Sequence, residues 1–141
     1  MGIKQYYEIP QFSAILSFID AIFSEINIGL LIYHVEDAND IHSARLIYAN
    51  KEASRYTGTD LQNLVGKYIF EAFPGLEDTE IPRLYSEVAQ EKQARLVGVV
   101  EYSDDRVKHG RYATRAFPMP SSCIGVAFTE ASEADDTEKP D

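Results

Sequence analysis

The sequence predicts an α+β domain in which helices cover one face of an antiparallel sheet. Three observations lead to this fold class. A helical pattern of apolar residues opens the chain and two apolar, β-rich segments follow it. Several helical segments then come together, and three further β-rich segments close the chain. Strands and helices grouped in this order are typical of an α+β arrangement. We therefore expect a five-stranded antiparallel sheet and an additional amphipathic helix flanking it at the N-terminus.

The first helix is predicted over residues 9–26, where large apolar residues recur at helical spacing. Pro10 lies near its start, where a proline is tolerated. Such an apolar face must be covered by the sheet of the same chain or by a second chain, and the two are compatible. The residues that we expect at a dimer interface are Phe12, Ile15, Ile19, Ile22 and Phe23.

The remaining elements follow from alternation, turn residues and helical spacing. Strands are predicted over 28–35 and 44–49, with a polar loop over 36–43 that is longer than a tight hairpin connection. The later elements are short helices within 51–73, a longer helix over 80–93, and strands over 94–102, 111–118 and 122–129. We divide the chain into a flanking helix (1–27), a domain (28–130) and an acidic tail or linker (131–141) with almost nothing to bury.

Charge and composition exclude several classes of protein. The net charge is −10, and the segment from Glu130 onward contributes half of it. This argues against nucleic-acid binding, which needs clustered Lys and Arg. No apolar run approaches the roughly 18 residues of a membrane span, and the N-terminus lacks a secretion pattern. Cys123 is the single cysteine, so no intramolecular disulfide can form and the cytoplasm is the expected location.

Residues 47–73 carry the most informative pattern of the chain. Asn50 follows the second predicted strand and is suited to cap a helix, because its side-chain oxygen can accept amide protons of the first turn. Gly58 and Gly66 then supply the left-handed backbone that ends such short helices. We assign Asn50, Gly58 and Gly66 structural roles.

This pattern resembles the core signature of PAS domains: a strand, Asn, two small residues, Gly, then Leu-x-Gly. The matching residues here are Tyr48, Asn50, Ala53, Ser54, Gly58, Leu64 and Gly66. The resemblance covers about residues 28–132, and the final segment from Ile124 to Glu130 stands where the family often closes with an Asp-Ile-Thr-Glu-like sequence. It implies the PAS fold, with its helices between the second and third strands.

The resemblance also implies a function. PAS domains sense signals or dimerise, and they regulate a histidine kinase, a cyclase or a transcription regulator in cis or in trans. Light-sensing members carry a reactive cysteine in a central helix, yet residues 66–73 contain none and Cys123 falls in the last strand. Haem-binding members place a histidine on the long helix, and residues 79–93 contain none. Cysteinyl-flavin and helix-histidine haem are therefore disfavoured, and the cofactor stays unknown.

A hollow between the sheet and the helices is the expected ligand site. Alternation places Val97 and Val99 on one face of their strand, and Tyr112 and Thr114 together on the next. If the last two point inward, they offer two hydroxyls to a ligand; otherwise they complete the core. The full set of pocket candidates is Tyr56, Phe70, Tyr85, Val97, Val99, Tyr112 and Thr114.

No catalytic motif or metal-ligand spacing is present, and His34, His42 and His109 are candidates by residue type only. We therefore expect no enzyme, and three classes predict different structures. A small-molecule sensor predicts a cavity with inward hydroxyls that the protein does not pair. A dimerisation module predicts a filled core with the first helix buried between chains. A small enzyme predicts titratable groups that converge in a cleft.

Overall fold

The computed structural model describes residues 10–131, with side chains described from residue 13. Residues 1–9, the side chain of Phe12 and the acidic segment from residue 132 lie outside the described part. The described elements are α1 (Pro10–Glu25), β1 (Gly29–Asp37), β2 (Asp40–Ala49), α2 (Lys51–Thr57), η2 (Leu61–Leu64), α3 (Ile69–Ala72), η3 (Pro74–Leu76), α4 (Ile81–Glu91), β3 (Arg95–Tyr102), β4 (Gly110–Met119) and β5 (Cys123–Glu130). No helix in this range has the length and apolar character to span a membrane.

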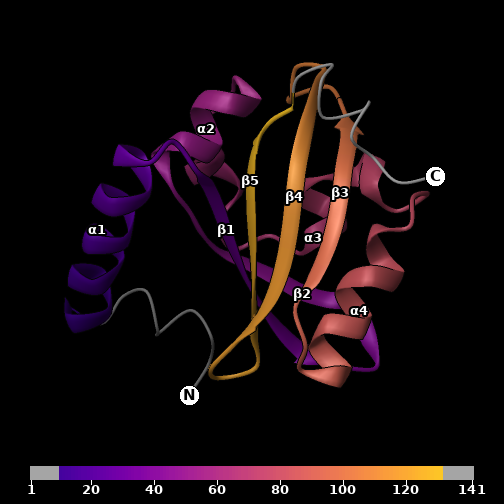
Figure 1. Cartoon of the computed structure of the whole chain (residues 1–141). Helices are drawn as coiled ribbons and strands as arrows, with labels where there is room; N and C mark the ends of the chain where they lie inside the picture. Colours follow the sequence, from indigo (N-terminus) through magenta and orange to yellow (C-terminus); the bar gives the residue numbers. More distant parts are fainter. Residues whose placement is uncertain (1–9, 132–141) are drawn as a thin grey trace.

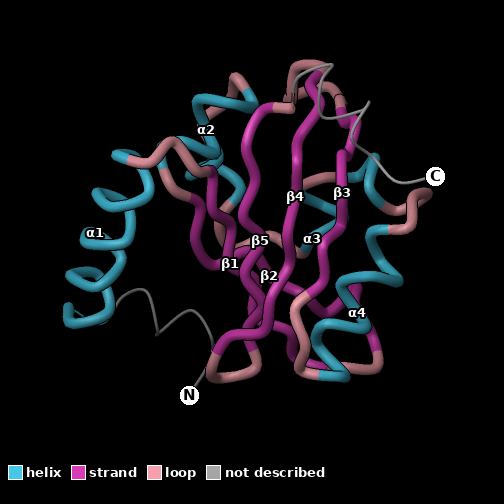
Figure 2. The backbone as a smooth tube through the Cα atoms, in the orientation of Figure 1, coloured by secondary structure: helices cyan, strands magenta, loops and turns pink. Residues whose placement is uncertain are grey.

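The five strands form one antiparallel sheet in the order β2-β1-β5-β4-β3 (Figures 1 and 2). The helices between β2 and β3 pack on one face and enclose the main apolar core. A smaller cluster on β1 and β2, flanked by side chains of β4 and β5, is covered by α1, which stands apart from α4 across the strands in Figure 1. This arrangement confirms the predicted α+β class with a flanking helix.

Asn50 joins three elements at the end of β2. Its Oδ1 accepts hydrogen bonds from the backbone N–H of Ala53 and of Leu30, both at 2.9 Å, while its Nδ2 donates to the carbonyl of Ile28 at 2.9 Å. The side chain is 1% exposed. The predicted helix cap is therefore confirmed, and the same amide also fixes the start of β1 to the start of α2.

The two motif glycines adopt the backbone that the sequence predicted. Gly58 ends α2 with a φ of 74°, and its N–H donates to the carbonyl of Ser54. Gly66 has a φ of 99°, and its N–H donates to the carbonyl of Leu46 at 2.7 Å. Residues with a Cβ rarely adopt such angles, so these positions set the direction of the chain between α2 and α3.

The predicted polar loop over 36–43 is wrong. β1 continues to Asp37, β2 begins at Asp40, and these two residues pair across a tight turn. The polar side chains stabilise this turn locally: Asp37 Oδ1 accepts from the N–H of Asn39, and Ser43 Oγ accepts from the N–H of Asp37. Residues that usually signal a loop here form a hairpin because their side chains supply the turn's hydrogen bonds.

A β-bulge in β3 overturns the predicted alternation of its valines. The register with β4 shifts between Leu96 and Gly98, where Gly98 has a φ of 91°. The extra residue reverses the faces beyond it. Val97 and Val100 consequently pack against the main core, whereas Val99 pairs with Ala113 and does not.

Helix α1 has two apolar faces. Leu16, Ile19 and Phe23 pack against the cluster on the sheet. A second set, spaced three or four residues apart along the helix and the residue that follows it, is more than half exposed; we call it the α1 stripe: Ile15 (54%), Phe18 (72%), Ile22 (56%) and, just after the helix, Ile26 (55%). The helix therefore folds back on its own sheet and still presents an apolar surface.

Replacement of Asn50 by alanine is expected to lower the free energy of unfolding by about 2 to 4 kcal/mol, because the cap is lost and two buried and one half-buried backbone groups lose their partner. Urea unfolding of the purified chain measures this change. Asn63→Ala is the matched control: Asn63 is exposed, so its effect should stay within about 0.5 kcal/mol. A loss below about 1 kcal/mol for Asn50→Ala would contradict the role assigned to this residue.

Candidate functional site: a cavity between the sheet and the helices

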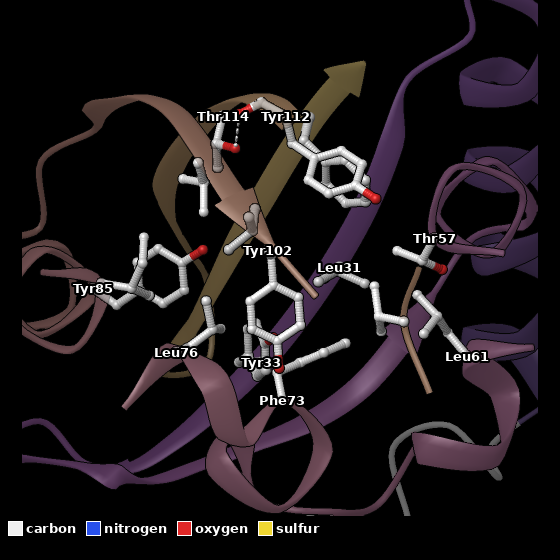
Figure 3. Close-up of a pocket in the computed structure, with 15 residues that line it drawn as sticks. Leu31, Tyr33, Thr57, Leu61, Phe73, Leu76, Tyr85, Tyr102, Tyr112 and Thr114 are labelled. Atoms are coloured by element: carbon white, nitrogen blue, oxygen red, sulfur yellow. Dashed lines mark hydrogen bonds between the residues drawn. The ribbon is translucent and has the colours of Figure 1, made fainter. Parts of the chain in front are cut away.

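A cavity of about 70 Å³ lies between the inner face of the sheet and the helices that cover it (Figure 3). Strands β1, β3, β4 and β5 form one wall, and the opposite wall comes from α2, η2, η3, α4 and the β3–β4 loop. The lining combines aliphatic and aromatic side chains with four tyrosines and two threonines: Leu31, Tyr33, Thr57, Leu61, Phe73, Leu76, Ile81, Tyr85, Val100, Tyr102, Val107, Tyr112, Thr114, Val126 and Phe128.

Three of the seven predicted pocket residues line this cavity: Tyr85, Tyr112 and Thr114. Three others, Tyr56, Phe70 and Val97, pack against the main core outside the lining. Val99 is directed away from it by the bulge in β3.

The hydroxyls of Tyr112 and Thr114, which the sequence offered as ligand contacts, bond to the chain itself. Thr114 Oγ1 donates to the carbonyl of Tyr112 at 2.9 Å, and the Tyr112 hydroxyl donates to the carbonyl of Tyr56 at 3.3 Å. The third hydroxyl of this type, that of Thr57, donates to the carbonyl of Ala53 at 2.8 Å. Tyr112 and Thr114 therefore complete the core, which was the alternative to ligand contact in the sequence analysis.

Tyr33 and Tyr85 behave differently from the other tyrosines of the cavity. They are 1% and 4% exposed, and neither hydroxyl forms a hydrogen bond with a described residue. Their rings lie 6.3 Å apart between centroids, and in Figure 3 the Tyr85 oxygen points from α4 toward the strands. Burial raises the pKa of both phenols, so both carry their proton at neutral pH. The cavity thus contains two phenolic O–H groups that lack a protein acceptor.

Sequence reasoning overlooked Tyr33, although a signal was present. In β1 it alternates with Leu31 and Val35, and all three side chains belong to the main core. A tyrosine on the inward face of a central strand is the one feature that could have identified it.

Tyr102 fixes the β3–β4 loop at the edge of the cavity. Its hydroxyl donates to Asp104 Oδ2 and accepts the N–H of Gly75 at 3.1 Å. Asp104 Oδ1 accepts the N–H groups of Arg106 and Val107, at 2.8 and 2.7 Å. This arrangement holds the Val107 side chain, which is 1% exposed, in the cavity wall.

The lining does not fit a haem or a flavin. Pockets for drug-sized ligands measure roughly 300 to 1,000 Å³, several times the volume of this cavity. No histidine or cysteine belongs to the lining. Cys123 packs in the cluster beneath α1, where burial raises the pKa of its thiol to about 11, so it remains protonated.

The histidines do not form a metal site with acidic neighbours. Within residues 10–131, no three His, Cys, Asp or Glu side chains gather where they could hold a metal ion. His42 forms exposed pairs with Asp40 and Glu77, at 3.3 and 2.8 Å, which connect the β1–β2 hairpin to the chain before α4. The cavity lining contains none of these histidines, and it can offer a bound molecule hydroxyl groups and apolar contacts.

Comparison with known proteins identifies the fold. No protein-family model matches the sequence, and neither does any curated protein. Among solved structures, the PAS domain of nitrogen regulation protein NR(II) from Vibrio parahaemolyticus matches with a TM-score of 0.59 and 14% identity, over 80% of this chain and 97% of that one. The LOV protein of Rhodobacter sphaeroides matches with a TM-score of 0.62 and 14% identity, over 84% and 67%.

A third match is the photoactive yellow protein domain of the sensor histidine kinase Ppr from Rhodospirillum centenum, with a TM-score of 0.59 and 14% identity over 79% and 92% of the two chains. This is the PAS fold. The cavity described above therefore lies between the sheet of a PAS fold and the helices that connect its second and third strands.

Replacement of a single hydroxyl should distinguish the paired from the unpaired tyrosines. Tyr102→Phe removes a hydroxyl with two partners and is expected to lower the free energy of unfolding by about 1 to 2 kcal/mol. Tyr85→Phe removes one that has none, and should leave this free energy unchanged or raise it by up to about 1 kcal/mol. Thermal and urea unfolding of both variants provide the measurement. Equal losses in the two variants would show that Tyr85 has a protein partner after all.

Proposed function

We propose that this chain is a cytoplasmic PAS-type sensory module that binds a small molecule in its cavity and regulates a signalling partner in cis or in trans. The observation that carries the proposal is the pair of hydroxyls on the cavity-lining residues Tyr33 and Tyr85, which donate to no described residue. Both residues line the cavity, so a water molecule or a ligand inside it can accept these two hydroxyl protons. An inward hydroxyl of this kind is what a sensor predicts and a filled dimerisation core does not.

The sheet provides a short route from the cavity to the surface. In β1, Leu31 and Tyr33 line the cavity, while the alternate residues Leu30 and Ile32 belong to the cluster beneath α1. A ligand that shifts β1 therefore changes the contacts of α1 directly, since one strand separates the two. Such a ligand acts by favouring one packing of sheet and helix over another.

Similar structures support a signalling context. A domain of a sensory box sensor histidine kinase/response regulator from Geobacter sulfurreducens matches with a TM-score of 0.60 and 11% identity, over 88% of this chain and 99% of that one. At this identity the likeness concerns the fold, and a histidine kinase is one of the effectors, beside a cyclase or a transcription regulator, that we propose for this module.

Native mass spectrometry of the freshly purified chain tests ligand binding. We expect an additional mass that is lost on denaturation, and that Val100→Phe abolishes, because Val100 lines the cavity. Val99→Phe is the matched control, since the neighbouring side chain faces away and should leave the additional mass in place. If the wild-type chain carries no additional mass and Val100→Phe is the more stable of the two variants, the cavity is a packing defect and the sensor proposal is wrong.

The α1 stripe favours a second role, homodimerisation. Apolar residues spaced three or four apart form one continuous surface along a helix, and a twofold contact between identical stripes covers both copies at once. The stripe contains Ile15 and Ile22 from the interface predicted by the sequence, and adds Phe18 and Ile26. Ile19 and Phe23 already contact the chain's own sheet, so we leave them out of the proposed interface.

Sedimentation velocity tests the dimer. Phe18→Glu places a charge in the centre of the stripe and should weaken dimerisation at least about thirtyfold, the effect of roughly 2 kcal/mol at an interface hot spot. Ser17→Glu adds the same charge at the neighbouring exposed position, and should leave the dimer intact. A wild-type chain that sediments as a monomer at all accessible concentrations would contradict this role.

A further inference from the structure

The hydroxyl protons that face the cavity fall into two groups. Those of Thr57, Thr114, Tyr102 and Tyr112 are donated to acceptors of the chain itself. Those of Tyr33 and Tyr85 are not donated to any described residue. The cavity therefore presents two free donors, and a bound molecule must offer an oxygen or nitrogen acceptor to satisfy them.

The lining carries no charge. Its fifteen residues are aliphatic or aromatic side chains, tyrosines and threonines, without an Asp, Glu, Lys, Arg or His among them. An ion moved from water into such a site would lose its hydration without gaining a counter-charge, which is strongly unfavourable. Burial also raises the pKa of Tyr33 and Tyr85, so the site keeps its own phenols neutral. Anions are accordingly excluded, although a phenol would otherwise donate to them well.

The volume sets the size of the ligand. A dry apolar cavity of about 150 Å³ accepts benzene, and the cavity here measures about 70 Å³. On that scale a molecule of about three non-hydrogen atoms fits the existing space. A planar molecule of four such atoms requires a small movement of the walls, and larger ones require more.

Taken with the proposed function, on which this step rests, we infer that the cavity selects small, uncharged, largely apolar molecules with a hydrogen-bond acceptor, of which a short-chain ketone is the simplest case. The Tyr33 and Tyr85 hydroxyls recognise the carbonyl oxygen, and the aliphatic lining contacts the alkyl part. The site thereby discriminates against a carboxylate of the same shape by its charge and against a hydrocarbon of the same shape by its missing acceptor.

Three probes of matched shape test this selectivity: acetone, acetate and isobutene. Each has four non-hydrogen atoms in a plane, and they differ in acceptor and charge. Binding is followed by amide chemical shifts of the full chain in NMR titrations, with the wild type, the Tyr33→Phe/Tyr85→Phe variant and Tyr68→Phe as a control. Tyr68 lies outside the cavity lining, and its hydroxyl interacts with Arg45 instead.

In the wild type and in Tyr68→Phe, acetone should bind saturably with shifts centred on β1 and α4, more tightly than isobutene, and acetate should not bind. In the double variant, acetone affinity should fall at least about tenfold, the effect of one lost hydrogen bond or more, while isobutene affinity stays equal or rises. Phenylalanine preserves the shape of both rings, so a general loss of packing would weaken both probes alike.

The outcomes separate this inference from the proposed function. If isobutene binds as well as acetone, or if the double variant retains the acetone affinity, the assigned selectivity is overturned while the cavity remains a binding site. If acetate binds as tightly as acetone, the neutral-ligand requirement is overturned. If none of the probes perturbs the cavity residues in any of the three proteins, the cavity is closed to ligands, and the sensor proposal is overturned together with the selectivity.

Discussion

The side-chain amide of Asn50 determines where the helical layer begins. It is buried and forms three hydrogen bonds. Two reach Ile28 and Leu30, which flank the first residue of β1, and the third reaches Ala53 in the first turn of α2. Since α2 starts at this point, the same amide positions Thr57 and, through the turn at Gly58, the chain that continues into η2 and Leu61. Those residues form one wall of the cavity. The three hydrogen bonds of this amide thus fix the start of α2 against β1, and with it the position of one part of the cavity wall.

The interior shows two different solutions for a buried hydroxyl. The hydroxyls of Thr57, Thr114 and Tyr112 donate to backbone carbonyls and that of Tyr102 donates to the Asp104 carboxylate, which removes the cost of burying them and contributes to rigidity. Tyr33 and Tyr85 do not, and they lie on a central strand and on the longest covering helix, whose positions define opposite sides of the cavity. A molecule that bonds to both would therefore connect β1 with α4. This is how a ligand much smaller than a flavin could still alter the packing of the whole layer.

Patterns among neighbouring residues made much of the fold predictable. The site was harder to predict, because it depends on contacts between residues that are far apart in the sequence. The cap at Asn50 and the turns at Gly58 and Gly66 depend on residues within a few positions, so the sequence contained the information needed to place them. The face occupied by Val99 could not be predicted, because the bulge beside it depends on pairing with β4. The sequence left open whether the hydroxyl of Tyr112 contacts a ligand or the chain itself, since its acceptor is a carbonyl 56 residues away along the chain. Whether a polar group is satisfied is decided by tertiary structure, and alternation alone cannot show it.

The bulge in β3 also affects how copies of this protein can associate. β3 is the outermost strand on its side of the sheet, and an outer strand with regular backbone is a template for further strands. The irregularity at Leu96 to Gly98 interrupts that template, and the space around the Cβ position of Gly98 is open, so the glycine serves the backbone rather than the packing. Strand-by-strand extension of the sheet, the usual route to fibrils, is thereby hindered at this edge.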